Sequence, residues 1–416
     1  MTHIETNNIY TIGSLKQNVQ NPKEKETINE THLPEQKASD LNKNPDCIYN
    51  QILVNKVENK PVYKKNSKDN FRACLVGGAI GDAVGRPIER VRIGDIKERY
   101  GEDGIQDMAT VGMKGRFTDD TQMTIFTADG LIKSALKNGN TSQAPDYKTV
   151  YESYKDWYRT QTEGRKNEPE IIQDRGWIGK LGELYYPNGA GRTTLSALQN
   201  GVMGTPEKPI NNANSCGAVM RVAPAGLMYH NNPKMAFDVG VRCGAMTHSG
   251  VEAYLPAGVF ASMIAYIIQG ETPESALDKS IEILKEYDQS EISTKLADLL
   301  KKAKVYAKDD NLDHEVAIDK LGKGWRGDEA LAITAYCVLK EPNDFKKAIL
   351  MAVNHDGDSD STGAMAGNLL GAYLGSDKIP QDWTENVEIS DKIKELADDL
   401  YNPGEIKDAN EKYLSK

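Results

Sequence analysis

Several features that decide the class of a protein are scarce in this chain of 416 residues. It has only 6 Phe and 4 Trp and no convincing strands of alternating polarity, which argues against a β-sandwich built on aromatic and β-branched runs. Its 5 Cys are odd in number and form no CxxC pair, so a reduced setting fits better than a secreted disulfide scaffold. No apolar run approaches the ~20 residues that span a bilayer, and no signal peptide is visible at the start. We therefore expect a cytoplasmic protein that does not engage a membrane.

Basic character is lacking too, because the net charge at pH 7 is −10. This argues against a surface that coats nucleic acid, although a small basic pocket for phosphates is still compatible with it.

Composition changes sharply near residue 68. The first 70 residues hold 12 Asn, a single Gly and no Phe or Trp. We expect residues 1–67 to form an extended or disordered arm, because they offer too little apolar area to offset the entropy of ordering. Within the arm, only the run 48–54 (IYNQILV) is suited to anchor to another protein. The arm is either a dispensable tail or a segment that docks on a partner.

From residue 68 to 416 the sequence predicts one all-α domain. Small apolar residues and glycine pairs fill 71–84, which is typical of a closely packed buried helix. Further helices are expected at 122–136, 254–270, 328–339 and 363–374, with amphipathic helices between 271 and 320. The polar, Gly-rich stretch 160–190 is expected to be a long loop or insertion.

Two acidic clusters about 240 residues apart stand out in this domain, TDDT at 118–121 and DSDST at 358–362. Carboxylates this crowded repel one another, so a fold that gathers them normally adds cations. Hard oxygen ligands without a Cys or His pair nearby favour Mg²⁺, Mn²⁺ or Ca²⁺ over Zn²⁺. The clusters predict one oxygen-rich metal site assembled from both ends of the domain.

Two simpler interpretations of the clusters fit the sequence less well. Asp356, Asp358 and Asp360 fall at positions 1, 3 and 5 of an EF-hand loop, but Ser361 replaces its glycine and Gly367 its glutamate, so that interpretation fails twice. Helix capping explains one such residue before each helix, and the clusters contain more than capping needs.

The Gly-rich run 77–85 lacks the GxxxxGK[ST] pattern of a phosphate-binding loop and does not follow a strand. Its informative residues are Asp82 and Glu89, which lie about two helical turns apart if the helix continues past Pro87.

Four later positions allow more than one interpretation. Arg221 follows a turn of small residues that either holds a pyrophosphate or is an ordinary turn. His248 precedes a buried helix and is either structural or part of a site. Trp325 either stacks on a base or packs in the core. Cys216 is not expected to be a catalytic thiol, because nothing in the sequence places a base beside it.

Taken in order, these segments closely resemble the ADP-ribosylglycohydrolase family, which includes the bacterial dinitrogenase-reductase-activating glycohydrolases and the ADP-ribosyl-acceptor hydrolases of animals. The matching segments are GGAIGDAVGRPIE (77–89), GRFTDDTQMTI (115–125), NSCGAVMRVAPAG (214–226), THSGVEAY (247–254), GWRGDEALAIT (324–334) and GDSDSTGAMAGNLLGAYLG (357–375). The resemblance covers most of residues 70–380 and not the arm. It implies a compact all-α fold with a binuclear Mg²⁺ centre, or Mn²⁺ in its place.

The resemblance also implies roles for individual residues. The implied metal ligands are Thr118, Asp119, Asp120, Asp358, Asp360 and Ser361, with Asp360 at the position that bridges the metals. The implied catalytic carboxylates are Glu89, Asp119 and Asp120. The implied substrate-site residues are Asp82, Ser215, Gly217, Arg221, His248 and Trp325; of these, Asp82 has a structural character and Trp325 faces adenine.

The implied reaction removes ADP-ribose from a modified protein side chain, with arginine the leading substrate, by cleaving the glycosidic bond at C1″. The implied partner is therefore an ADP-ribosylated protein. An alternative from another class is an immunity protein that neutralises an ADP-ribosyltransferase toxin by occlusion through residues 1–67, with or without hydrolysis.

Overall fold

The structure is a computed structural model that describes residues 66–162 and 176–414. The chain divides into a unit of residues 1–61 and a unit of residues 62–416, and all described residues belong to the second unit. The arm predicted at 1–67 therefore lies almost wholly outside the described residues, and its boundary stays a prediction.

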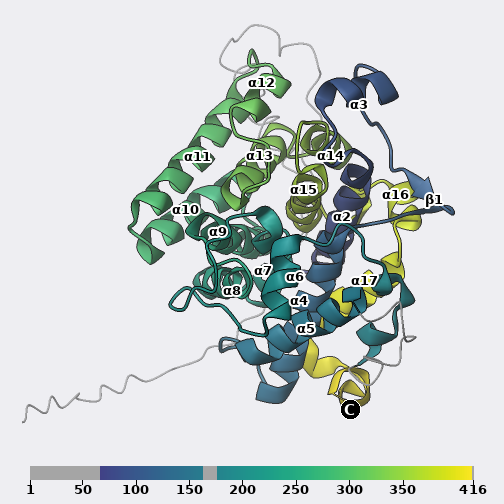
Figure 1. The fold of residues 1–416 in the computed structure, drawn as a ribbon, viewed down its shortest axis with the longest axis vertical. Helices are drawn as coiled ribbons and strands as arrows, with labels where there is room; N and C mark the ends of the chain where they lie inside the picture. Colours follow the sequence, from purple (N-terminus) through teal and green to yellow (C-terminus); the bar gives the residue numbers. More distant parts are fainter. Residues whose placement is uncertain (1–65, 163–175, 415–416) are drawn as a thin grey trace, which may run out of the picture. The chain divides into compact units, whose positions relative to one another are not determined.

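Helices make up nearly all the regular structure of the second unit's described part (Figure 1). The α-helices are α2 (Lys68–Gly85), α3 (Ile93–Tyr100), α4 (Asp119–Asn138), α5 (Tyr147–Thr162), α6 (Arg192–Gln199), α7 (Ala223–Met228), α8 (Pro233–Ala245), α9 (Val251–Ile268), α10 (Pro273–Tyr287), α11 (Glu291–Lys308), α12 (His314–Asp319), α13 (Gly327–Lys340), α14 (Phe345–Val353), α15 (Ser359–Leu374), α16 (Gln381–Asn386) and α17 (Ser390–Tyr401). Short 3-10 turns are η1 (Arg86–Ile88), η4 (Trp177–Lys180), η5 (Gly182–Tyr185), η6 (Cys216–Ala218), η7 (Ser376–Lys378) and η8 (Pro403–Glu405), and η9 (Asn410–Leu414) is a π turn.

The only sheet within 66–162 and 176–414 is a hairpin of two antiparallel two-residue strands, β1 (Thr110–Val111) and β2 (Lys114–Gly115). The expected all-α class is confirmed.

The central pair of helices, α2 and α15, approach each other through glycine (Figure 1). A Cβ atom added to Gly81 would lie 1.9 Å from the carbonyl oxygen of Gly363, and one added to Gly77 would lie 2.5 Å from that of Gly367. Only glycine permits this backbone contact. Gly85 against Ser359 and Gly371 against Ala73 extend the same antiparallel ladder. The ladder places the end of α2 beside the start of α15.

A third helix end joins them through Asp82, a fully buried residue of α2. Its Oδ1 accepts a hydrogen bond from the backbone N–H of Thr118 at 2.9 Å. Its Oδ2 accepts one from the N–H of Thr121 at 3.0 Å and one from the Thr121 hydroxyl at 2.6 Å. Asp82 thus satisfies free N–H groups at the start of α4 and fixes that end against α2.

The rest of the core is built around α9, which packs against α8, α10 and α13, with α11 beyond α13 (Figure 1). By length and composition, α9 is the one helix in the described ranges that could cross a membrane, and 83% of the apolar window is buried inside the protein. This corrects the expectation that no apolar run approaches a membrane span. A buried core helix can have the same length and composition, so this finding is only weak evidence that α9 crosses a membrane.

Candidate active site

A cavity of about 650 Å³ opens where the ends of α2, α4 and α15 meet. Most of the residues singled out in the sequence line it: Glu89, Asp119, Asp120, Ser215, Gly217, His248, Trp325, Asp358, Asp360 and Ser361. Three do not, namely Asp82, Thr118 and Arg221. The fold therefore brings both acidic clusters to one cavity, although about 240 residues separate them.

The first cluster presents its carboxylates from the first turn of α4. Asp119 accepts a hydrogen bond from the backbone N–H of Gly191 at 3.1 Å. Asp120 accepts one from the Thr118 hydroxyl at 3.2 Å through Oδ2, while its Oδ1 is buried without a partner among the described residues. Because Asp82 and Thr118 already cap α4, the carboxylates of Asp119 and Asp120 are left for another task.

The second cluster lies at the start of α15. It faces Glu89, which directly follows η1. One oxygen each from Glu89, Asp358 and Asp360 lie within 4.8 Å of one another, a spacing that suits a metal ion. Asp358 occupies the N-cap position of α15 and makes no capping bond with its side chain. Capping therefore does not explain its presence.

Burial and mutual repulsion raise the pKa of these carboxyl groups. Burial is the largest cause in each case. It raises the pKa of Asp119 to about 7, with Asp360 and Glu89 adding to the effect and the Gly191 N–H opposing it. The pKa of Asp120 is raised well above its ordinary value by burial and by the charge of Asp360. That of Asp358 is raised in the same way.

The site fits a hard divalent cation. It offers several carboxylate oxygens, one of them buried and unpartnered, and groups of one sign whose proximity is unfavourable without added positive charge. Oxygen donors of this kind suit Mg²⁺, Mn²⁺ or Ca²⁺. Glu89, Asp358 and Asp360 have carboxylate oxygens close enough together to hold it, and Asp120 brings an unpartnered oxygen to the same cavity.

Cys216 lies beside a carboxylate that its own segment of sequence does not indicate. Its thiol donates a hydrogen bond to Asp358 Oδ2 at 2.6 Å and lies 3.5 Å from the Ser361 hydroxyl. Burial and the charge of Asp358 raise the pKa of this thiol well above its ordinary value. Because a protonated thiol is a poor nucleophile, this placement agrees with the expectation that Cys216 is not a catalytic thiol.

A loop that sequence reasoning left without a function closes one side of the cavity. Gly189, Gly191 and Arg192 belong to the segment 189–194, which lines it. Gly189 has φ +79, and a Cβ there would lie 3.2 Å from Asp119 Oδ1. The NGAG run at 188–191 was visible within the stretch predicted to be a loop, but nothing local indicated its neighbours.

Ser215, Gly217 and His248 line another part of the cavity wall. His248 Nε2 and the Ser215 hydroxyl are 3.0 Å apart. The His248 ring packs directly on Gly217, since a Cβ at that position would lie 3.0 Å from its Cε1. A small residue at 217 is therefore needed for the histidine to sit at the cavity wall.

Trp325 and Arg90 flank the mouth. The guanidinium carbon of Arg90 lies 5.6 Å from the Trp325 ring centroid, a cation–π distance. Arg90 Nε also donates to Glu89 Oε1 at 2.8 Å. Trp325 is 38% exposed, which favours a surface for stacking over a packed core residue. Arg90 was missed, because an arginine after a glutamate carries no signal of its own.

Arg221 was expected to face the pyrophosphate, and the structure places it elsewhere. Its side chain is fully buried and donates to the Cys243 carbonyl at 3.0 Å and to the Thr247 hydroxyl at 2.7 Å. Both carboxylate oxygens of Asp82 likewise accept hydrogen bonds from the start of α4. Direct substrate contact does not fit either placement.

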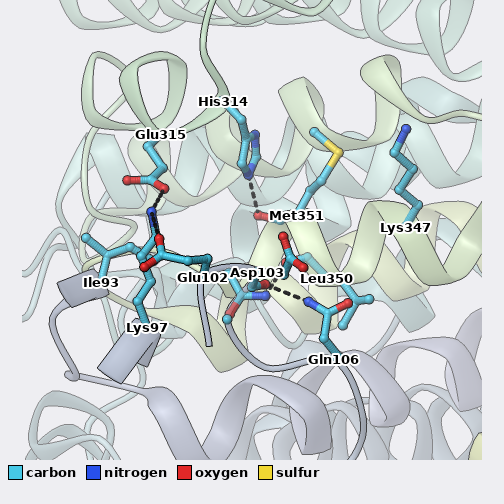
Figure 2. A pocket seen from close by; sticks show the side chains of 12 residues that line it. Ile93, Lys97, Glu102, Asp103, Gln106, His314, Glu315, Lys347, Leu350 and Met351 are labelled. Atoms are coloured by element: carbon cyan, nitrogen blue, oxygen red, sulfur yellow. Dashed lines mark hydrogen bonds and ion pairs between the residues drawn. The ribbon is translucent and has the colours of Figure 1, made fainter. Parts of the chain in front are cut away.

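A second pocket, of about 340 Å³, lies between α3, α12 and α14 (Figure 2). Lys97 points between two acidic side chains there, at 2.5 Å from Glu315 and 4.0 Å from Glu102 (Figure 2). His314 Nε2 lies 3.1 Å from the Met351 carbonyl oxygen. The pocket thus holds charges of both signs, with Lys97 paired to its two glutamates. It does not gather buried carboxylates of one sign as the cavity does.

Comparisons with known proteins identify the family of this chain. The family model for ADP-ribosylglycohydrolase matches residues 64–409. An uncharacterized protein of Archaeoglobus fulgidus is 27% identical over 336 residues, which cover 80% of this chain and 96% of that protein. ADP-ribosylarginine hydrolase Tri1 of Pseudomonas putida is 25% identical over 343 residues, with 80% and 78% covered. ADP-ribosylhydrolase ARH3 of Homo sapiens is 25% identical over 373 residues, with 80% and 93% covered.

A solved structure of an ADP-ribosylglycohydrolase-related protein complex shares the fold. Its TM-score is 0.58 at 23% sequence identity, and the match covers 82% of this chain and 99% of that chain. The family expected from the motifs is confirmed. The chain belongs to the ADP-ribosylglycohydrolase family, whose members hydrolyse ADP-ribosyl linkages.

Proposed function

We propose that this protein is a hydrolase that depends on two Mg²⁺ ions, or Mn²⁺, and removes ADP-ribose from modified arginine side chains of proteins. The observation that carries the proposal is the convergence of Glu89, Asp119, Asp120, Asp358 and Asp360 on one cavity from three helix ends. At α4 the capping bonds are made by Asp82 and Thr118, and at α15 Asp358 makes no capping bond with its side chain. This concentration of carboxylates therefore calls for a chemical role.

The reaction breaks the bond between C1″ of the ribose and the guanidine nitrogen, and the oxygen of a water molecule adds to C1″. When bound, divalent cations supply Lewis-acid charge that orients the sugar hydroxyls and lowers the pKa of water. The carboxylates of Glu89 and Asp119 face the positive charge that develops at C1″ and stabilise it. The attacking water loses one proton, and the leaving nitrogen needs one. The Glu89 carboxylate is suited to take that proton from the water and pass it to the nitrogen, because burial and the charge of Asp360 raise its pKa. Glu89 thus begins and ends the reaction as a carboxylate.

Two observations favour arginine as the modified residue. The first is chemical: a guanidinium group is a cation, and the cavity presents carboxylates to it. The second is the name of a relative that covers 80% of this chain, the ADP-ribosylarginine hydrolase Tri1. ARH3 relatives match equally well, so the proposal needs a direct comparison of linkages.

The test measures release of ADP-ribose from proteins modified on arginine and, in parallel, on serine. Each is assayed with Mg²⁺, with EDTA, and with the Asp120→Ala variant. We expect Mg²⁺-dependent release from arginine that the variant lacks. Faster release from serine would overturn the arginine assignment and leave the hydrolase. Nucleic-acid conjugates are assayed in the same way, and no release from arginine, serine or nucleic acid would overturn the hydrolase itself.

A second candidate function concerns residues 1–67, which lie almost wholly outside the described residues. Their Asn-rich composition and the apolar run 48–54 favour a segment that docks on an ADP-ribosyltransferase toxin in the cytoplasm and obstructs it. Deleting residues 1–67 should abolish this protection and leave hydrolysis unchanged, whereas Asp120→Ala should do the reverse. A deletion that changes neither toxin binding nor protection would show that the arm is only a tail.

A further inference from the structure

A continuous chain of hydrogen bonds connects the buried side chain of Arg221 with the cavity wall. Arg221 Nη2 donates to the Thr247 hydroxyl at 2.7 Å. The same hydroxyl oxygen lies 2.8 Å from His248 Nδ1, and His248 Nε2 lies 3.0 Å from the Ser215 hydroxyl. Of these four residues, Ser215 and His248 line the cavity.

Arg221 is an unusual residue to find at the inner end of such a chain. It is fully buried, no ion pair with a carboxylate is recorded for it in the described ranges, and its Nε and Nη1 have no hydrogen-bond partner there. Its guanidinium carbon lies 4.6 Å from the centre of the Tyr154 ring, a cation–π contact. A buried cation without a counter-ion is costly, so its field should matter to the polar groups nearby.

The direction of each bond follows from which groups can accept. Arginine has no acceptor, so the Thr247 oxygen must accept from it. The Thr247 hydroxyl hydrogen then needs an acceptor of its own, and among the described residues only His248 Nδ1 is recorded within reach. Burial and the charge of Arg221 lower the pKa of His248 to about 3, so the ring is neutral near pH 7. With Nδ1 accepting, the single ring hydrogen is on Nε2 and is donated to Ser215.

We infer that Arg221 is a positioning residue: through Thr247 it fixes His248 as the Nε2–H tautomer, which turns the Ser215 hydroxyl hydrogen into the cavity as a donor for an anionic oxygen of the substrate diphosphate. The identity of that anion rests on the proposed function. The buried cation thus acts on the diphosphate through three intervening side chains, without contact.

Packing supports the geometry of this relay. The backbone N–H of Cys216 donates to the Trp325 carbonyl at 3.0 Å, and that of Gly327 to the Asn214 carbonyl at 3.0 Å. These bonds hold the 214–216 segment against the start of α13. Gly217 leaves room for the imidazole, since a Cβ there would lie 3.1 Å from Nε2. The Ser215 hydroxyl and the ring therefore have little freedom to separate.

The first experiment is nitrogen-15 NMR of the whole protein labelled at histidine, with the His248 signals assigned from a His248→Gln spectrum. Protonated and bare ring nitrogens resonate far apart, so the tautomer is read directly. We expect Nε2–H in the wild type and in Thr247→Ser, and a shift of population toward Nδ1–H in Thr247→Val. Thr334→Val is the matched control, because the Thr334 hydroxyl is buried without a partner.

The second experiment measures ADP-ribose affinity by calorimetry. Thr247→Val should weaken binding about tenfold, as expected for loss of one hydrogen bond to a charged group, and Thr247→Ser should restore it. In a Ser215→Ala background, Thr247→Val should have little further effect, since coupled residues are not additive.

Three results would each overturn the relay. They are an Nδ1–H ring in a wild type that hydrolyses its substrate, an unchanged tautomer in Thr247→Val, and an additive effect of Thr247→Val on top of Ser215→Ala. A wild type with the Nε2–H ring that binds no ADP-ribose would instead overturn the proposed function, so the two failures are distinguishable.

Discussion

The acidic cavity and the pocket of Figure 2 contain similar kinds of charged side chain in opposite circumstances. In the pocket, Lys97 lies between Glu315 and Glu102, whose side chains are 47% and 93% exposed. In the cavity, buried carboxylates of one sign face each other, and Arg90 is paired with only one of them. Buried groups of one charge therefore indicate a site more strongly than an opening in which exposed charges of both signs pair.

The largest expected difference is between removing one carboxylate from the cavity and removing one from the pocket. Asp360→Asn should lower the rate of ADP-ribose release by at least about 10²-fold, because the residue is placed to hold a cation and to stabilise developing charge. Glu315→Gln, in the paired pocket, should leave the rate within about twofold. Initial rates at saturating Mg²⁺ decide this. A comparable loss in both variants would erase the distinction between the two regions.

The next effect is on stability. A cation that binds only the folded cavity should stabilise it by about 2.7 kcal/mol when present at 100 times its Kd. We expect thermal unfolding to shift upward by several degrees with Mg²⁺ in the wild type and in Glu315→Gln. The shift should be lost in Asp360→Asn. An equal shift in Asp360→Asn would place the stabilising ion elsewhere.

A smaller effect should appear with pH in the metal-free protein. Burial raises the pKa of Asp119 to about 7 and that of Asp82 to about 8, above the ordinary value near 3.9. A raised carboxyl pKa favours the protonated folded form. Its contribution is therefore fully present below about pH 4 and is lost as pH rises to about 7–8, by up to roughly 1.4 kcal/mol per pH unit and group. Denaturant unfolding between pH 5 and 8 should show this decline.

Added Mg²⁺ should flatten or reverse that decline, because metal ligands bind in their deprotonated form. A metal-free protein whose stability rises over the same pH range would show that these carboxyls are not held as the cavity geometry indicates.

The smallest effect is expected at the mouth. Trp325→Ala should raise the KM for the ADP-ribosylated substrate about fivefold through loss of a stacking surface, with little change in kcat. Trp325→Phe should restore much of the affinity. Equal KM values for the wild type and Trp325→Ala would assign the ring to the Arg90 contact alone.

Much of the architecture could be predicted because it depends on local pattern. The helices expected at 71–84 and 363–374 are present as α2 and α15, and both acidic clusters reach one cavity. Long apolar runs bounded by capping residues carry such information within one segment.

Tertiary neighbours could not be predicted in the same way. Cys216 and Asp358 are 142 residues apart, and their contact depends on how α15 packs against η6. Arg221 was read as a surface or ligand-facing residue, because nothing in its own segment shows that Tyr154 and Thr247 enclose it. Glycine recurs every four residues in both helices, at 77, 81 and 85 and at 363, 367 and 371. This repeat is the one feature of the sequence that could have predicted the pairing of α2 with α15.

That glycine ladder has a consequence for heredity. The backbones of α2 and α15 are in direct contact at Gly77, so a methyl group added there would push the two helices apart. Gly77 lies five residues before Asp82, roughly 7.5 Å along the helix at 1.5 Å per residue. A side chain at this position would tilt α2 and so displace the acidic residues at its far end. No smaller residue exists to compensate on the other helix. Substitution of these glycines should therefore be poorly tolerated in both helices. A mutation can then disrupt the metal centre from a residue that never touches it.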